Sequence, residues 1–178
     1  MKLKLAGLEN DSIVDGPGIR FTVFVQGCPH HCEGCHNPQT WDFSGGYFED
    51  TEEIYQKILK NPLLDGVTFS GGEPFCQCHE LADLADKIIS GTRLNLMAYT
   101  GFEIEYLIEH STEENGFMRL LEKLDFLVDG RFILSQKSYD LKFKGSANQR
   151  FIDVKKTLKD LEVVLAVDPW DNLEIKLI

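Results

Sequence analysis

The chain has 178 residues, of which 43% are hydrophobic, so it can bury the core of one compact domain. Its formal net charge of -11 argues against a general nucleic-acid-binding surface, because such surfaces are basic. No apolar run is long enough to span a bilayer, and the N-terminal residues lack the features of a signal peptide. We therefore expect a single domain over residues 1–178, located in the cytoplasm, with no nucleic-acid and no membrane partner.

Strand patterns and helix patterns alternate along the chain. β-Branched, aromatic and other apolar runs predict strands over residues 19–26, 66–70, 94–100, 125–128, 151–154 and 161–167. Amphipathic spacing and an N-cap at Asp50 predict helices over residues 50–59, 81–89, 103–110 and 117–124. The tail, residues 168–178, has an alternating pattern that suggests a last docked strand. Alternating strands and helices are typical of an α/β fold with a largely parallel sheet.

Three cysteines carry the strongest chemical signal. Cys28, Cys32 and Cys35 follow the first predicted strand with Cys-x3-Cys-x2-Cys spacing, and no fourth cysteine lies nearby. Three thiolates on one loop can hold three irons of a four-iron cluster, which leaves the fourth iron open to a small molecule. A cluster that only transfers electrons usually has all four irons capped by cysteine, and a structural zinc site also takes four ligands. The spacing therefore favours a cluster with an open coordination position.

Other polar and glycine-rich segments follow the predicted strands. The sequence Gly71-Gly72-Glu73-Pro74, the pair Tyr99-Thr100 and Asp129 each come directly after a strand. Functional groups in parallel sheets collect at the carboxyl ends of the strands, so we expect these segments and the cysteine loop to share one mouth. Two glycines allow a ligand to approach the backbone, and a following glutamate can bind an ammonium group; a plain tight turn is the alternative interpretation.

These motifs together resemble the radical S-adenosylmethionine (SAM) enzymes. The segment Asp15–Arg20, together with Cys35-His36-Asn37-Pro38 after the cysteines, resembles the activases of glycyl-radical enzymes. The stretch Gly145–Arg150 resembles the activating proteins of the anaerobic ribonucleoside-triphosphate reductases. The resemblance covers roughly residues 5–155 and implies an α/β fold of the radical SAM type, a partial, laterally open (β/α) TIM-like barrel.

The resemblance implies a role for each matching residue. Cys28, Cys32 and Cys35 are expected to be the catalytic metal ligands of a 4Fe-4S cluster, whose open iron binds SAM. The expected cofactor-binding residues are Gly34, Cys35, His36, Gly71, Gly72, Glu73, Tyr99, Thr100 and Asp129. Glu73 is expected to face the ammonium group of SAM, and Asp129 its ribose or carboxylate end. Contacts with the protein substrate are expected from Asp15, Gly16, Pro17, Gly18, Arg20, Asn148 and Arg150.

The implied activity is the generation of a glycyl radical on another protein. A reduced cluster cleaves SAM to methionine and a 5′-deoxyadenosyl radical, which takes a hydrogen atom from a glycine of the partner. The implied partner is the anaerobic ribonucleoside-triphosphate reductase, and the implied electron donor is a low-potential protein such as flavodoxin or ferredoxin. A first alternative is an activase of pyruvate formate-lyase or of another glycyl-radical enzyme.

Two further possibilities do not involve radical chemistry. His30, His31 and His36 flank the cysteines, so a non-catalytic zinc site or a small iron-sulfur module is an alternative of another class. Cys76 and Cys78 form a Cys-x-Cys pair that can hold a metal or a regulatory disulfide. Because no other ligands cluster with this pair in the sequence, two free thiols are the favoured interpretation.

Overall fold

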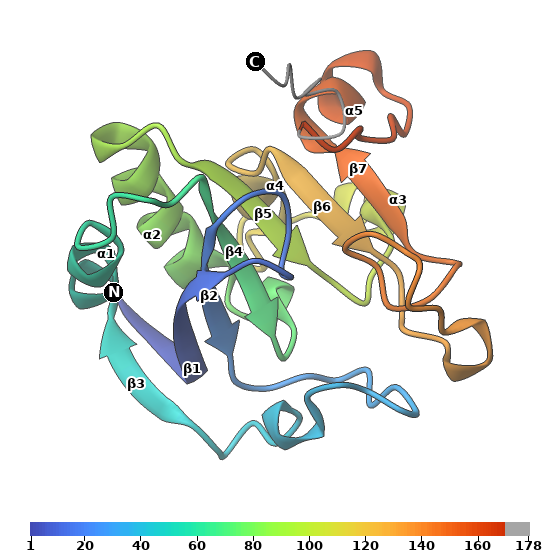
Figure 1. The fold of residues 1–178 in the computed structure, drawn as a ribbon, viewed down its shortest axis with the longest axis horizontal. Helices are drawn as coiled ribbons and strands as arrows, with labels where there is room; N and C mark the ends of the chain where they lie inside the picture. Colours follow the sequence, from blue (N-terminus) through green and yellow to red (C-terminus); the bar gives the residue numbers. More distant parts are fainter. Residues whose placement is uncertain (170–178) are drawn as a thin grey trace, which may run out of the picture.

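The computed structural model describes residues 1–169 of the chain. Within them, seven strands form one sheet and five α-helices pack against it (Figure 1). The strands are β1 (Lys2–Ser12), β2 (Arg20–Val25), β3 (Tyr47–Asp50), β4 (Gly66–Gly71), β5 (Asn95–Tyr99), β6 (Phe126–Asp129) and β7 (Arg150–Asp153). The helices are α1 (Thr51–Ile58), α2 (Cys78–Gly91), α3 (Ile104–Glu109), α4 (Phe117–Leu121) and α5 (Val154–Asp160). Short 3-10 turns occupy Pro38–Thr40, Pro74–Cys76 and Leu134–Gln136.

The sheet has the order β3-β1-β2-β4-β5-β6-β7. Its four central strands, β2, β4, β5 and β6, are parallel neighbours in the sheet, and the only other strand that comes between them along the chain is β3, which pairs elsewhere. β1, β3 and β7 pair antiparallel at the two sides, so β3 and β7 form the edges of an open sheet. The predicted α/β class is confirmed. The carboxyl ends of the four parallel strands lie at the same end of the sheet, so the loops that follow these strands lie close together.

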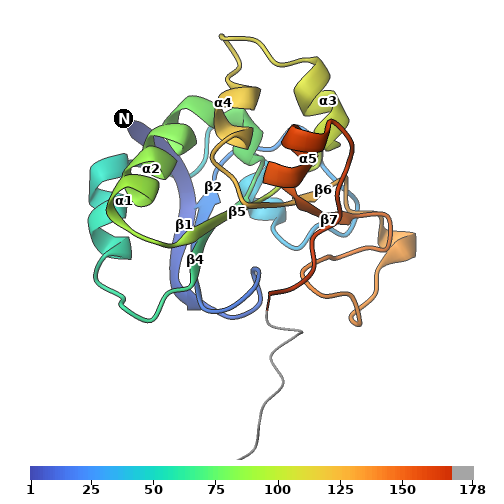
Figure 2. The same cartoon turned by 90° about the horizontal axis from the view of Figure 1, so that it is seen from above.

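The helices α1 to α4 lie on one side of the sheet (Figure 2). Alternate strand residues face them, so the core is built from side chains such as Phe21, Val23 and Val25 of β2, which are fully buried. The intervening residues face the other side, where the buried side chains are polar or large, among them Arg20 and Thr22. The two faces of the sheet therefore carry different chemistry: one is apolar, and the other mixes polar side chains with apolar ones such as Met97.

Local signals explain where α1 begins and how α2 packs. The Asp50 side chain accepts a hydrogen bond from the Glu52 amide at 2.9 Å, which caps α1 as predicted. α2 buries Leu81, Leu84 and Ile88 along one stripe, as the spacing predicts. Ile89, which was expected on that stripe, is 49% exposed.

Three elements of the structure were missed, and one predicted strand is absent. β1, β3 and α5 were not predicted, and residues 161–167 do not form a strand. Leu161 instead ends α5 with a left-handed backbone, φ 57°, and only Leu165 pairs with the sheet, through a single bridge to Ile152. Almost all of the strand suggested for residues 168–178 lies outside the described residues. Within residues 1–169, no helix has the length and apolar character needed to cross a bilayer.

Candidate active site

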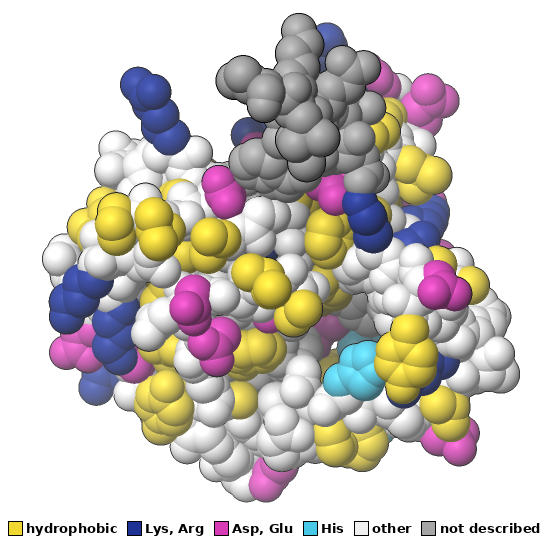
Figure 3. Space-filling view, viewed as in Figure 1, with side chains coloured by type: hydrophobic (Ala, Val, Ile, Leu, Met, Phe, Trp, Pro, Cys, Tyr) yellow, Lys and Arg dark blue, Asp and Glu magenta, His cyan; other side chains and the backbone are white. Residues whose placement is uncertain are grey.

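A cavity of about 390 Å³ opens at the carboxyl ends of the parallel strands. The loop that follows β2 runs across these strand ends in Figure 1, and Figure 3 shows a hollow in the middle of the same face. Nearly every motif found in the sequence contributes to its lining. The predicted site residues that line it are Asp15, Cys28, Cys32, Cys35, His36, Gly71, Gly72, Glu73, Tyr99 and Thr100. The predicted shared mouth therefore exists.

The cysteine loop, residues 27–37, is held in place by the segment that returns beside it. The amides of Gly27 and Cys28 donate to the carbonyls of Thr40 and Trp41, at 2.8 and 3.1 Å. Cys28 is 9% exposed, and burial raises the pKa of its thiol above the ordinary value. A metal that binds this sulfur displaces the thiol proton.

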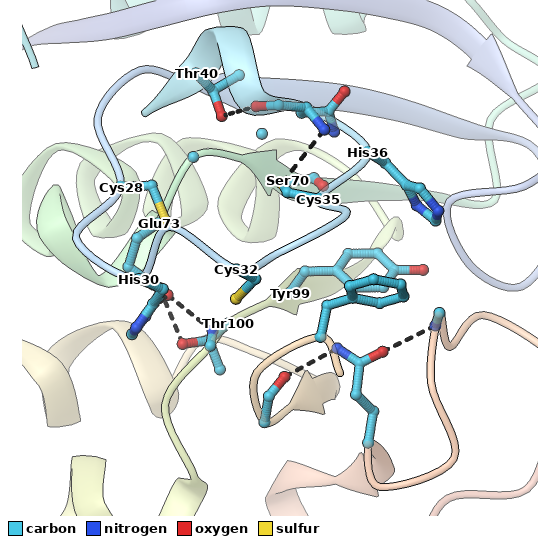
Figure 4. Close-up of a pocket in the computed structure, with 18 of the residues that line it drawn as sticks. Cys28, His30, Cys32, Cys35, His36, Thr40, Ser70, Glu73, Tyr99 and Thr100 are labelled. Atoms are coloured by element: carbon cyan, nitrogen blue, oxygen red, sulfur yellow. Dashed lines mark hydrogen bonds and ion pairs between the residues drawn. The ribbon is translucent and has the colours of Figure 1, made fainter. Parts of the chain in front are cut away.

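The cysteine loop supplies three thiols, the number of ligands expected for a four-iron cluster with one open iron. All three loop cysteines are free thiols and line the same cavity, as Figure 4 shows. Among the described residues, no three Cys, His, Asp or Glu side chains converge on one point as the ligands of a single ion do. In a four-iron cluster each thiolate binds a different iron. Neither Cys76 nor Cys78 lines the cavity, so the three thiols leave one iron of such a cluster without a cysteine ligand.

The two glycines after β4 allow the next turn to press against the cysteine loop. Gly71 has φ 94°, and a Cβ on it would lie 2.7 Å from the Phe24 Cα. A Cβ on Gly72 would lie 2.9 Å from the carbonyl carbon of Gly27, so a side chain there would push the cysteine loop away. The Glu73 amide completes the contact by donating to the Gly27 carbonyl at 2.8 Å. Glycine is therefore required at both positions for close backbone approach.

The Glu73 carboxylate is buried, 1% exposed, and accepts four hydrogen bonds from the chain itself. Oε1 accepts from the Phe75 amide at 3.0 Å and from the Thr100 hydroxyl at 2.9 Å. Oε2 accepts from the Gly101 amide at 2.8 Å and lies 2.7 Å from Nε2 of His30 (Figure 4). A carboxylate has about four acceptor positions. In this arrangement protein donors occupy about as many positions, and the expected contact of Glu73 with a ligand ammonium group stays a prediction.

Asp129 was expected beside the ligand, but it does not line the cavity. Its carboxylate is 1% exposed and accepts from Nε of Arg150 at 3.0 Å and from the Ile104 amide at 2.9 Å. It faces a neighbouring hollow of about 580 Å³, whose lining also includes Arg150 and Asn148. The sequence predicted the strand end correctly, but the side chain turns toward α3 and β7. Asp129 is thus a structural anchor in this structure, and its assignment as a cofactor-binding residue stays a prediction.

Arg20 was expected to contact a protein substrate, and this expectation is wrong because its side chain is fully buried. It donates to the Asn95 side chain at 2.8 Å and to the Pro17 carbonyl at 2.9 Å. Burial lowers the pKa of Arg20 to about 10, which still leaves the guanidinium charged at neutral pH. Gly16 packs against this side chain, and a Cβ on Gly16 would lie 2.7 Å from the Arg20 Cδ.

The loop around Arg20 reaches the surface at other residues. Gly16 and Pro17 are buried and Gly18 is half-buried, so these three residues shape the loop from within. The residues before them, Ile13 and Val14, are 73% and 74% exposed, and Val14 lines the cavity. Sequence reasoning missed both, because two apolar residues beside a strand are ordinarily read as core.

The stretch Gly145–Arg150 braces the loop that follows β6. The Gln149 side chain donates to the Gly130 carbonyl at 2.9 Å and accepts from the Gly145 amide at 2.8 Å. The Asn148 side chain is exposed and donates to the Arg131 carbonyl at 2.8 Å. This bracing fixes the backbone on both sides of the cavity wall.

The braced loop brings an unpredicted aromatic side chain to the cavity. Phe132 lines the cavity, and its ring centroid lies 5.4 Å from that of His36. Leu134, from the same loop, packs where a Cβ of Gly34 would lie, at 2.8 Å, so this packing requires glycine before the third cysteine. Gly34 itself does not line the cavity. Nothing in the local sequence marks Phe132, because its position depends on the long-range contacts of the stretch Gly145–Arg150.

Cys76 and Cys78 form no disulfide and are free thiols in this structure. Cys76 is exposed, whereas Cys78 is buried at the start of α2 and donates to the Phe75 carbonyl at 3.2 Å. Burial raises the pKa of the Cys78 thiol, so it behaves as a small core side chain.

Comparisons with known proteins agree with this site. Residues 14–152 match the family model described as a 4Fe-4S single cluster domain. The anaerobic ribonucleoside-triphosphate reductase-activating protein of Vibrio cholerae is 35% identical over 147 residues, which are 77% of this chain and 89% of that protein. The corresponding protein of Haemophilus influenzae is 31% identical over 146 residues, again 77% of this chain and 89% of its own length.

Two other similarities are shorter or more distant. The pyruvate formate-lyase-activating enzyme of Clostridium pasteurianum is 45% identical over 86 residues, which are 46% of this chain and 36% of that enzyme. The crystal structure of QueE from Escherichia coli has a TM-score of 0.44 with 20% identity over 57% of this chain and 53% of that one, too distant to support an argument. On the family model and the near full-length relatives, the chain belongs to the family of anaerobic ribonucleoside-triphosphate reductase-activating proteins.

Proposed function

We propose that this protein is a radical SAM activase that generates a glycyl radical on an anaerobic ribonucleoside-triphosphate reductase. One observation carries the proposal: three free cysteines from one short loop line a cavity together with a double-glycine turn. Family membership supports the same conclusion. The four consecutive parallel strands with helices on one side support a partial, laterally open barrel of the radical SAM type.

The cavity residues divide into cluster ligands and cofactor contacts. Cys28, Cys32 and Cys35 would hold a 4Fe-4S cluster, and its open iron would bind SAM. Gly71 and Gly72 would place the methionine end by close backbone approach. When bound, the reduced cluster and SAM would supply a 5′-deoxyadenosyl radical. The formation of this radical is the difficult step of the reaction.

The remaining wall would hold the adenosine end and keep water out. His36 and Phe132 present two rings 5.4 Å apart at the cavity, a suitable border for a flat heterocycle. Tyr99 is more buried than His36, and burial raises the pKa of its hydroxyl. The Tyr99 side chain therefore stays neutral and adds no negative charge to the cavity wall. These side chains orient the cofactor and exclude solvent from a reactive intermediate.

Length favours the reductase over other partners. The chain covers 89% of the two reductase-activating relatives, but only 36% of the pyruvate formate-lyase-activating enzyme of C. pasteurianum. An activase of pyruvate formate-lyase remains the second candidate, since the 45% identity to that enzyme is concentrated in 86 residues. We further propose a low-potential electron donor such as flavodoxin or ferredoxin, and a reducing cytoplasm, where five free thiols persist.

Electron paramagnetic resonance tests the proposal and separates the two candidates. The anaerobically reconstituted protein is incubated with SAM, a strong reductant and either the anaerobic reductase or pyruvate formate-lyase. We expect a glycyl radical signal on the reductase that depends on all three loop cysteines. A radical on pyruvate formate-lyase alone would overturn the choice of partner, and no radical on either enzyme would overturn the proposed activity.

A further inference from the structure

His30 lies between the first two cysteines of the loop and points into the protein. Its side chain is only 4% exposed. The ring packs edge-on against Phe102, with centroids 4.5 Å apart and planes at 73°. A Cβ on Gly101 would overlap the ring, so glycine leaves the space that the histidine fills. A buried polar side chain in a metal-binding loop needs a partner, and this one has a specific partner.

That partner is Glu73, whose carboxylate joins three segments of the chain: its own turn, the turn after β5 and the cysteine loop. It accepts from its own turn through Phe75 and from the turn after β5 through Thr100 and Gly101. The 2.7 Å contact with Nε2 of His30 adds the cysteine loop to this junction. The carboxylate acts as the acceptor in its other three hydrogen bonds, and a carboxylate has no proton to donate. Nε2 of His30 is therefore assigned as the donor in the fourth contact. Both side chains are buried, at 4% and 1% exposure, so solvent does not compete for this hydrogen bond.

We propose that His30 is a positioning residue, and that its hydrogen bond to Glu73, here called the latch, holds the cysteine loop against the strand ends before any cluster is bound. In this assignment Glu73 is the fixed anchor of the loop, rather than a ligand for the ammonium group of SAM. The backbone contacts of Gly27 and Cys28 fix the start of the loop, and the latch fixes its middle, between Cys28 and Cys32. The metal-free loop therefore already presents its thiols to the cavity.

The adjacent histidine provides a matched control. His31 also lies between Cys28 and Cys32, but it is exposed and packs on the surface against Trp41, with ring centroids 4.9 Å apart. Its φ is 47°, a conformation that asparagine tolerates. His31→Asn thus changes the same loop in the same way as His30→Asn, but leaves the latch intact.

Hydrogen exchange of the metal-free protein tests the latch directly. We expect His30→Asn, whose side chain is too short to reach Glu73, to speed exchange of residues 27–36 by about tenfold or more, since a buried hydrogen bond to a charged group is lost. His30→Gln retains a donor of sufficient reach and is expected to restore most of the protection. Glu73→Gln, which loses acceptor capacity at constant size, is expected to loosen the same segment. His31→Asn is expected to exchange like the wild type.

A second readout follows the reconstituted protein. Iron release to a chelator is expected to be faster in His30→Asn and Glu73→Gln, and to be unchanged in His31→Asn. Wild-type exchange in His30→Asn, or no protection regained in His30→Gln, would overturn the latch. Glu73→Gln with normal exchange and iron retention but weaker SAM binding would also overturn it, because Glu73 would then be a ligand. The inference rests on the proposed cluster site, but the exchange experiment uses neither cluster nor SAM and thus fails or succeeds independently of the proposed activity.

Discussion

Arg150 and Asp129 are joined through two hydrogen bonds, with the Nε to Oδ1 distance at 3.0 Å. The side chain of Asp129 is 1% exposed and that of Arg150 is 31% exposed, so the guanidinium supplies the countercharge for a buried carboxylate. The same guanidinium contacts Glu105 of α3 through both carboxylate oxygens. One arginine from β7 therefore joins the end of β6 to α3, beside the loop that forms the cavity wall.

Removing this arginine is expected to destabilise the fold. Among residues 1–169, Arg150→Ala leaves the Asp129 carboxylate with the Ile104 amide as its remaining partner, and we expect a loss of about 2–3 kcal/mol in the free energy of unfolding. Arg150→Lys is expected to recover only part, because an ammonium group cannot make the forked contact with both carboxylates. Urea denaturation of the metal-free protein measures both changes.

A surface pair serves as the control for that measurement. Lys155 pairs with Asp125, and the lysine side chain is 65% exposed. Lys155→Ala should therefore cost no more than about 1 kcal/mol. If Arg150→Ala is as mild as Lys155→Ala, then the buried carboxylate does not depend on Arg150 and the anchor assignment is incorrect.

The pH dependence of stability should report on Glu105. The hydrogen bonds from Arg150 lower the pKa of Glu105 below its ordinary value of 4.5. A lowered folded-state pKa contributes stability above the unfolded-state pKa, and this contribution is lost as pH falls through the folded-state value. We expect Glu105→Gln to be less stable than the wild type at pH 7, with the difference shrinking below about pH 4.5. Urea midpoints measured from pH 7 to acid check this, and a difference that grows on acidification would contradict it.

Gly71 should not tolerate a side chain. Alanine at this position must adopt φ 94° and place its Cβ 2.7 Å from the Phe24 Cα, so we expect Gly71→Ala to cost about 1–3 kcal/mol from backbone strain alone. Thermal unfolding measures the loss. Gly7 of β1 is the matched control, since nothing lies within 4 Å of its Cβ position and its backbone is not in the left-handed region. Equal melting temperatures for the two variants would show that the turn after β4 adapts.

The loop cysteines and the other two cysteines should differ in metal binding. We expect Cys35→Ala to lose the iron and sulfide of a 4Fe-4S cluster after anaerobic reconstitution, because one iron loses its thiolate. Cys76→Ala should keep a full complement, since Cys76 lies outside the cavity. Iron analysis and the visible absorption spectrum give the readout. A colourless wild-type protein that holds zinc would instead support the non-catalytic module.

The strands that carry the site could be predicted because their signals are local. β2, β4, β5 and β6 are short runs rich in apolar and β-branched residues, and parallel topology then places their ends together. β1 and β3 could not be predicted, since the eleven residues of β1 mix apolar residues with lysine, glutamate and aspartate, and edge pairing stabilises them. The end of α5 could not be predicted, because the largely apolar residues 161–167 that follow it have the composition of a strand.

Side-chain direction limited the prediction of the site. Glu73 and Asp129 were placed correctly at strand ends, but their hydrogen-bond partners, such as His30 and Arg150, come from distant segments. Arg20 begins a strand, and the alternation of β2 turns its side chain into the polar face of the sheet. Phe132 reaches the cavity only because another segment braces its loop. Such long-range contacts leave no local pattern in the sequence.

Release of 5′-deoxyadenosine tests the central claim most directly. The protein, shown to hold a full cluster, is incubated anaerobically with SAM, a strong reductant and the anaerobic reductase, and the nucleoside is quantified. We predict release that requires the reductant and is abolished by alanine at Cys28, Cys32 or Cys35. No release from the cluster-loaded protein with the reductase present, or equal release by the cysteine variants, would contradict the account.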